Sequence, residues 1–201
     1  MSELKPNISY SAGVVFLVVR PDFTIEIPLV LERGGGWQPQ KVGQAFREKR
    51  IWKLPMGGFK PQRGDSNLID VAAAEWREET GFQSVREALR SERSFSFQKR
   101  SLRPGFQYHE DTFFLVVKGQ EPVEECLREE EEIEAVSFFP ITTLPTGKEP
   151  RSLGAEMSPG HQYKLADLLR ECAQYLWESG IDGGKLAEVV EAQIPISAAR
   201  R

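Results

Sequence analysis

The sequence predicts an α/β fold, because short runs of β-branched and apolar residues alternate with segments of helical periodicity. Residues 12–20 and 23–31 have the character of two neighbouring strands joined by a tight turn. A helix is expected at about residues 67–80, and an amphipathic helix at about residues 159–178 carries leucines at helical spacing. This alternation is typical of a sheet packed against helices.

The remaining segments extend the alternation along the chain. Apolar residues before Pro55 and Pro140 predict short strands at 51–54 and 135–139. Further strands are expected near residues 82–89, 92–97 and 112–118, and a short last helix at residues 185–192.

The length is that of one domain, which we expect to span residues 1–201. The chain has 201 residues and a mass of 22.8 kDa, enough to build a single hydrophobic core. We expect a core over about residues 10–178, a flexible loop at 33–50 and a C-terminal appendage at 179–201. The loop holds three consecutive glycines and five basic residues, and its Trp37 is a candidate for a substrate lid or a dimer contact. A homodimer held by the C-terminal helical segment is also an expectation.

The composition excludes several classes of protein. With 40% hydrophobic and 28% charged residues, the chain is typical of globular rather than disordered proteins. Its apolar runs are far shorter than the ~20 residues of a membrane-spanning helix, and its N-terminus has no apolar signal segment. We therefore expect a cytoplasmic protein with no membrane partner. The formal net charge of −4 argues against a nucleic acid partner, and Cys126 and Cys172 lack the spacing of a zinc site.

The helix at residues 67–80 has its own start and stop signals. Asn67 can cap the first turn, and Asp70 three residues later completes an arrangement that is similar to a capping box. Gly81 supplies the left-handed conformation in which many helices end. These signals predict a short helix with well-defined ends.

Three carboxylates lie on one face of this helix. Residues three and four apart share a helical face, so Glu75, Glu78 and Glu79 project to the same side. Like charges at this spacing cost about 0.2–0.5 kcal/mol per pair in isolated helices, which a nearby cation would offset. Oxygen ligands of this kind select Mg²⁺ or Mn²⁺. The alternative is a solvated, purely structural helix face, for example in an adaptor protein.

The segments LPMGGFKPQRGDS (residues 54–66) and VAAAEWREETGF (residues 71–82) resemble the signature of the Nudix hydrolases. That signature is G-x5-E-x7-R-E-U-x-E-E-x-G-U, in which U is a bulky apolar residue. Glu75 falls on the first glutamate after the arginine, and Glu78 and Glu79 fall on the glutamate pair.

The resemblance covers about residues 10–178 and implies both a fold and a function. The fold is an α/β/α sandwich with a mixed sheet and a C-terminal helix. The function is hydrolysis of a diphosphate linkage in a nucleoside diphosphate derivative, with Mg²⁺ or Mn²⁺ as the cofactor and a small-molecule nucleotide as the partner. ADP-ribose, nucleoside triphosphates and dinucleoside polyphosphates all remain open as substrates.

The resemblance also implies roles for individual residues. Glu78 and Glu79 are expected to bind the metal ion, with a backbone carbonyl of Gly57 or Gly58 completing its ligands. Glu75 is expected to act as a further ligand or as the general base.

A second candidate for the general base comes from an acidic segment. In several relatives the base is an acidic residue of a later loop, and the dense supply here is at residues 129–132. Distance from the following strand favours Glu132, and a solvated loop is the alternative interpretation of this segment.

The front half of the signature departs from the family pattern. Ala74 replaces the arginine, Asp65 or Ser66 replaces the upstream glutamate, and the spacing to the helix is longer. Arg77 and Arg63 are candidates to replace the missing arginine, which in the family orients the glutamates. A module that binds a nucleotide without cleaving it is the alternative function.

A basic and aromatic segment at residues 94–109 is the candidate for substrate binding. Arg100 and Arg103 can hold phosphates, and Phe106 can stack on a base. The alternative is a β-hairpin whose aromatic residues belong to the core and whose tip is basic for solubility.

Overall fold

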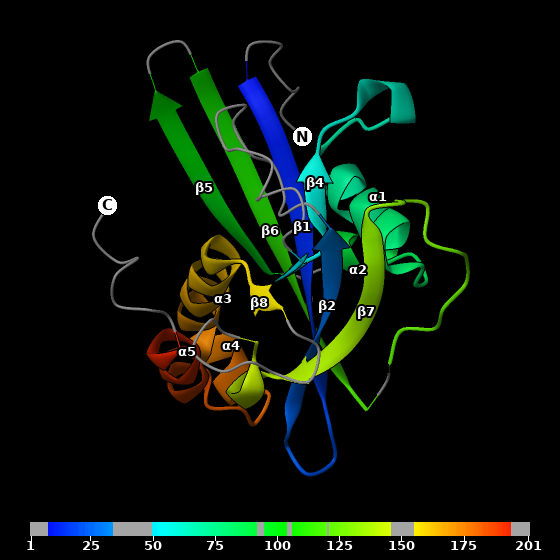
Figure 1. Ribbon diagram of the computed structural model, residues 1–201. Coiled ribbons are helices and arrows are strands. Elements are labelled where there is room, and N and C mark those ends of the chain that lie inside the picture. The colour runs from blue at the N-terminus through cyan, green and yellow to red at the C-terminus, as the bar shows by residue number, and fades with distance from the viewer. Residues whose placement is uncertain are drawn as a thin grey trace. The chain divides into compact units, whose positions relative to one another are not determined.

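The computed structural model describes residues 8–33, 50–91, 95–103, 106–119, 121–145 and 155–193 (Figure 1). Two compact units make up the chain: Met1–Val18 with Leu54–Glu130, and Val19–Lys53 with Glu131–Arg201. Residues 34–49 of the expected flexible loop, Trp37 included, lie outside the described residues. That loop and the single domain therefore stay predictions.

The first unit combines strands with two helices. Its elements are β1 (Ile8–Val19), β4 (Met56–Gly58), η2 (Pro61–Arg63), α1 (Leu68–Thr80), α2 (Arg86–Arg90), β5 (Phe95–Arg103) and β6 (Phe106–Lys118). Strand β6 lies between β5 and β1, and β4 pairs with β1 in antiparallel register, with Ala12 opposite Gly57 (Figure 1). Trp76 of α1 stacks on Phe16 of β1 with ring centroids 5.1 Å apart, which anchors the helix to the sheet.

The predicted strand at residues 82–89 is wrong. Phe82 forms only an isolated bridge with Glu124, and the chain then enters α2. Val85 and Leu89 are both buried and lie four residues apart, which is the spacing of one helical face rather than of a strand. Of the strand expected at 92–97, residues 95–97 lie in β5 and residues 92–94 lie outside the described part of the chain. The strand expected at 112–118 lies in β6, which forms an antiparallel hairpin with β5 whose register runs from Phe95 opposite Phe114 to Arg103 opposite Phe106.

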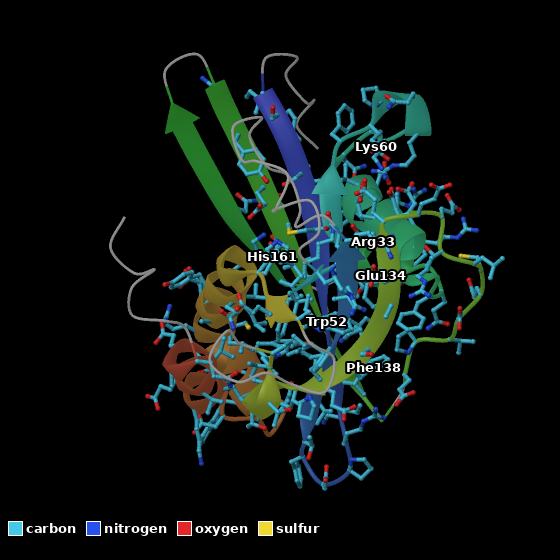
Figure 2. All side chains as sticks on the ribbon, in the orientation of Figure 1. Arg33, Trp52, Lys60, Glu134, Phe138 and His161 are labelled. Carbon is cyan, nitrogen blue, oxygen red and sulfur yellow. The ribbon has the colours of Figure 1, made fainter. Side chains whose placement is uncertain are left out.

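The second unit holds the other strands and the C-terminal helices. Its elements are β2 (Ile25–Arg33), β3 (Arg50–Lys53), β7 (Ile133–Pro140), η3 (Ile141–Thr143), β8 (Glu156–Met157), α3 (Pro159–Glu171), α4 (Ala173–Glu178) and α5 (Gly183–Ala192). Strand β2 pairs antiparallel with β3 and β7, whereas β8 pairs parallel with β3. Glu134 of β7 binds Arg33 and Arg50, with 2.6 Å between each Nε and a carboxylate oxygen. Figure 2 labels Glu134 and Arg33.

The predicted amphipathic helix is confirmed but divides into α3 and α4 at Cys172. The residues that predicted its apolar face, Leu165, Leu168, Leu169, Cys172 and Leu176, are all buried. Burial raises the pKa of the Cys172 thiol to about 12, so this cysteine is a neutral core residue at physiological pH. Helices α3, α4 and α5 pack against one another (Figure 1).

The expected α/β fold class is confirmed, with a mixed sheet and helices at the C-terminus. None of the helices in the described ranges has the length and hydropathy that crossing a membrane requires.

The predicted caps of α1 are confirmed. The side-chain oxygen of Asn67 accepts a hydrogen bond of 3.0 Å from the Asp70 amide. At the other end Gly81 has φ 74°, and its amide donates to the Arg77 carbonyl at 2.9 Å. These contacts define both ends of the helix that carries the three glutamates.

Removal of the N-terminal cap tests its contribution to stability. Asn67→Ala should lower the free energy of unfolding by about 1 kcal/mol, because one amide of the first turn loses its acceptor. Asn67→Ser keeps an acceptor and should cost much less. Urea denaturation followed by circular dichroism measures both variants, and an equal loss in the two would contradict a capping role.

Candidate active site

The three glutamates of helix α1 differ in how deeply they are buried. Glu75 and Glu79 are each only 3% exposed, whereas Glu78 is half-buried. Buried carboxylates need charged or hydrogen-bonding partners, because the loss of hydration is otherwise not compensated. The partners of these side chains therefore determine what the site can do.

Arg63 joins two of the three glutamates. Its Nη1 atom lies 2.7 Å from Oε1 of Glu75 and 2.7 Å from Oε2 of Glu78. Asp65 holds the same guanidinium from the other side, through Nε at 2.9 Å and Nη2 at 2.7 Å. One arginine thus connects the η2 turn to the acidic face of α1.

Lys60 is the second cation at this face. Its Nζ atom lies 3.2 Å from Glu78, 3.3 Å from Glu130 and 3.5 Å from Glu75. The Lys60 side chain is 38% exposed, and its position on the loop after β4 is labelled in Figure 2. Glu130, from the acidic segment, is thereby brought beside the glutamates of α1.

The pKa values of these groups follow from burial and from the mutual attraction of opposite charges. Burial raises the pKa of Glu75, although Arg63 and Lys60 oppose this effect by stabilising the ionised carboxylate. For Lys60, burial alone would lower the pKa, but the carboxylates around it, Glu75 first, raise it. Lys60 therefore keeps its positive charge at physiological pH.

Strand β4 brings its backbone against the two buried carboxylates. A Cβ atom on Gly57 would lie 2.1 Å from Oε2 of Glu75, so only glycine leaves room for this carboxylate. Next to it, the Met56 amide donates a hydrogen bond of 3.1 Å to Oε2 of Glu79. The glycine bend and the helix are thus in direct contact, whereas the role of a Gly57 or Gly58 carbonyl as a metal ligand stays a prediction.

The donor atoms at this face suit a hard divalent cation. Carboxylate oxygens of Glu75 and Glu78 already converge on one positive nitrogen, and Gly57 adjoins the Glu75 carboxylate. As they stand, however, no three Asp, Glu, His or Cys side chains among the described residues form a group that could hold a metal ion. An ion bound by Glu75 and Glu78 would share their oxygens with Arg63.

The other predicted site residues are placed as follows. The Gly58 carbonyl accepts a contact of 3.4 Å from Nη2 of Arg63. Glu132 is exposed, belongs to the second unit, and accepts a hydrogen bond from the Arg33 amide through its backbone carbonyl. Its role as a general base stays a prediction.

The predicted substrate-binding residues lie on the β5–β6 hairpin. Arg100 pairs in register with His109, and Arg103 pairs with Phe106. The side chains of Arg100, Arg103 and Phe106 lie outside the described part of the structure, so their proposed contacts with substrate stay predictions.

Sequence reasoning missed Lys60, favoured Glu132 over Glu130 within residues 129–132, and left Arg63 and Arg77 as alternatives. The structure favours Arg63, because Arg77 is exposed whereas Arg63 contacts both Glu75 and Glu78. Lys60 lies in the sequence between a glycine bend and an acidic helix, and this position could have predicted its contacts with the glutamates. No local pattern marks Glu130 among its acidic neighbours.

The chain belongs to the family of the NUDIX domain, whose sequence model matches residues 27–157. This match confirms the resemblance seen in the glutamate helix and places the chain in the class of Nudix pyrophosphohydrolases. A comparison with curated protein sequences finds no match.

Solved structures with a similar fold include three nucleotide-related proteins. The NUDIX domain of Shewanella oneidensis NrtR, complexed with ADP ribose, is 16% identical over 84% of this chain and 89% of that chain, with a TM-score of 0.47. A bifunctional NMN adenylyltransferase/ADP ribose pyrophosphatase from Francisella tularensis, complexed with AMP and a manganese ion, is 18% identical over 84% of this chain and 43% of that chain, with a TM-score of 0.49. The C. elegans Ap4A hydrolase is 14% identical over 67% of this chain and 81% of that chain, with a TM-score of 0.41. With identities and TM-scores this low, family membership rests on the match of the NUDIX domain.

Two glycine substitutions test the contact between β4 and α1. Gly57→Ala should displace the Glu75 carboxylate and lower turnover by roughly 100-fold, because a small misplacement of a group in the candidate active site is costly. The free energy of unfolding should fall by only about 1 kcal/mol, since the clash is with the end of a side chain.

Gly58→Ala is the matched control. Its Cβ would meet only the Tyr10 carbonyl, at 3.8 Å, which is an ordinary contact. Steady-state kinetics and thermal melting of the two variants separate the positions, and equal turnover in both would show that the Glu75 contact with Gly57 is unimportant.

Proposed function

We propose that the protein hydrolyses a diphosphate linkage in a nucleoside diphosphate derivative, in a reaction that depends on Mg²⁺ or Mn²⁺. The observation that carries this proposal is the contact of the Glu75 and Glu79 side chains with the β4 backbone, on the helix that matches the family signature. Both contacts place carboxylates beside the glycine bend of a NUDIX-family chain.

The chemistry of the substrate explains why such donors are needed. A diphosphate is anionic and repels an attacking oxygen, so a site must neutralise its charge and orient a water molecule. A bound divalent cation supplies both effects. In the proposed site, Glu78 and Glu79 hold the ion with a carbonyl of Gly57 or Gly58, and the Met56 amide fixes the Glu79 carboxylate against β4.

The general base is proposed among three carboxylates. Glu75 is the candidate on α1, and Glu132 is the candidate that the sequence favours in the acidic segment. Glu130 joins them because Lys60 links it to Glu75 and Glu78. The partly exposed Lys60 also offers a positive charge to a phosphate oxygen.

A nucleotide-binding module without turnover is the second candidate. Two observations favour it: Arg63 and Lys60 already neutralise Glu75 and Glu78, and Ala74 stands where the family has arginine. In that case the chain would bind the nucleotide derivative and release it unchanged.

A substrate panel separates the two candidates. Phosphate or nucleotide release from ADP-ribose, nucleoside triphosphates and dinucleoside polyphosphates should require Mg²⁺ or Mn²⁺. Release from none of them, together with saturable binding of one of them, would establish the binding module instead.

Substitution of a proposed ligand tests the role of the carboxylates. Glu79→Gln should lower kcat by roughly 100-fold or more while the fold is kept, because an amide is a much poorer metal ligand. Glu87→Gln, on an exposed residue of α2, is the control and should leave kcat unchanged. Turnover of Glu79→Gln at the wild-type rate would refute the metal assignment.

A further inference from the structure

Helix α1 does not itself supply a cation for its buried glutamates. Ala74 directly precedes Glu75, and Arg77 is exposed. Two carboxylates that share a face repel each other, and a buried one such as Glu75 is costly to ionise without a partner. A positive group from outside the helix is therefore required to hold Glu75 and Glu78 in one arrangement.

Arg63 meets this requirement with a single atom. Its Nη1 donates to one oxygen of Glu75 and one oxygen of Glu78, both at 2.7 Å, so the two carboxylates are held at a common point. The other oxygen of Glu75 faces Gly57. The contact with Arg63 thus sets the direction of the Glu75 carboxylate toward the β4 backbone.

The guanidinium is itself immobilised. Asp65 accepts two hydrogen bonds from it, one at each carboxylate oxygen, and the Lys60 amide donates a further 2.9 Å bond to Oδ2 of Asp65. The side chains of Asp65 and Arg63 are only 3% and 15% exposed. Gly64, with φ 85°, turns the chain between them, so that both side chains point to the same place.

We propose that Arg63, locked by Asp65, is the positioning residue that aligns Glu75 and Glu78 for the reaction, in place of a cation on α1. The use of this alignment in catalysis rests on the proposed function, whereas the alignment itself does not. Arg63 acts through the carboxylates and is assigned no contact with the reacting atoms.

A double-mutant cycle on metal binding tests the inference without any turnover. Mn²⁺ is titrated against the full chain and followed by electron paramagnetic resonance in the wild type, Arg63→Ala, Glu75→Gln and the double variant. If Arg63 positions Glu75, Glu75→Gln should weaken Mn²⁺ binding in the wild type but hardly change it in the Arg63→Ala background. The two effects of Glu75→Gln on Mn²⁺ affinity should differ by about fivefold or more. Additive effects, including no effect of either substitution, would overturn the proposal.

A rescue experiment tests the same inference by kinetics. Arg63→Ala should lower kcat by roughly tenfold or more with little change in KM, because positioning is lost and substrate contacts are kept. Arg63→Lys should recover only part of the rate, since an ammonium group cannot contact both glutamates and Asp65 in the same fork geometry.

An arginine on the helix should then replace the one removed from the turn. Ala74 is partly exposed and lies four residues before Glu78, so Arg63→Ala/Ala74→Arg should regain most of the lost kcat. Arg77→Ala is the control, because it removes an arginine of the helix whose side chain does not contact Glu75 or Glu78 in the described part of the structure. Circular dichroism checks the fold of each variant. A rise in kcat on removal of Arg63 would show that it blocks the site, and failure of the rescue would likewise overturn the proposal.

The two proposals fail in different ways. If the wild type hydrolyses no member of the substrate panel, the proposed function falls, and the Mn²⁺ cycle alone decides whether Arg63 aligns the carboxylates. If the panel shows turnover but the cycle is additive, the function stands and the role of Arg63 falls.

Discussion

The site depends on one electrostatic constraint: carboxylates gathered on one helix face must be neutralised by groups that the helix does not contain. Glu75 and Glu79 are almost fully buried, and Glu78 is half-buried. Arg63 and Lys60 come from the short segment between β4 and α1, and the β4 backbone receives the carboxylates directly. Because each contact compensates the burial of a charge, the turn, the strand and the helix form one interdependent arrangement.

The same constraint explains how a chain with a degenerate signature keeps an ordered site. With Ala74 in place of the family arginine, α1 would carry an uncompensated acidic face. Arg63 restores the missing charge from the η2 turn, and Asp65 restrains its guanidinium. The position of a charge in space, rather than its position in the sequence, is what the carboxylates require.

Local interactions account for what was predicted well. The caps of α1 depend on residues within four positions of each other, as Asn67 and Asp70 show, and the buried leucines of α3 follow from helical spacing. The strand predicted at 82–89 was wrong because a short apolar run fits both the helical period and the strand period. Val85 and Leu89, four residues apart, are both buried, which is the spacing of a helical face. Periodicity over so few residues cannot choose between the two.

The sequence by itself determined the α/β class, the capped helix, the shared face of the three glutamates and the family to which they belong. These features depend on residue spacing within single elements and on a contiguous motif. Only the tertiary structure decided which cations serve the glutamates, because Arg63 lies 12 residues from Glu75, and Lys60 lies 70 residues from Glu130. Contacts over such separations depend on the path of the backbone through turns and strands, which no local pattern encodes.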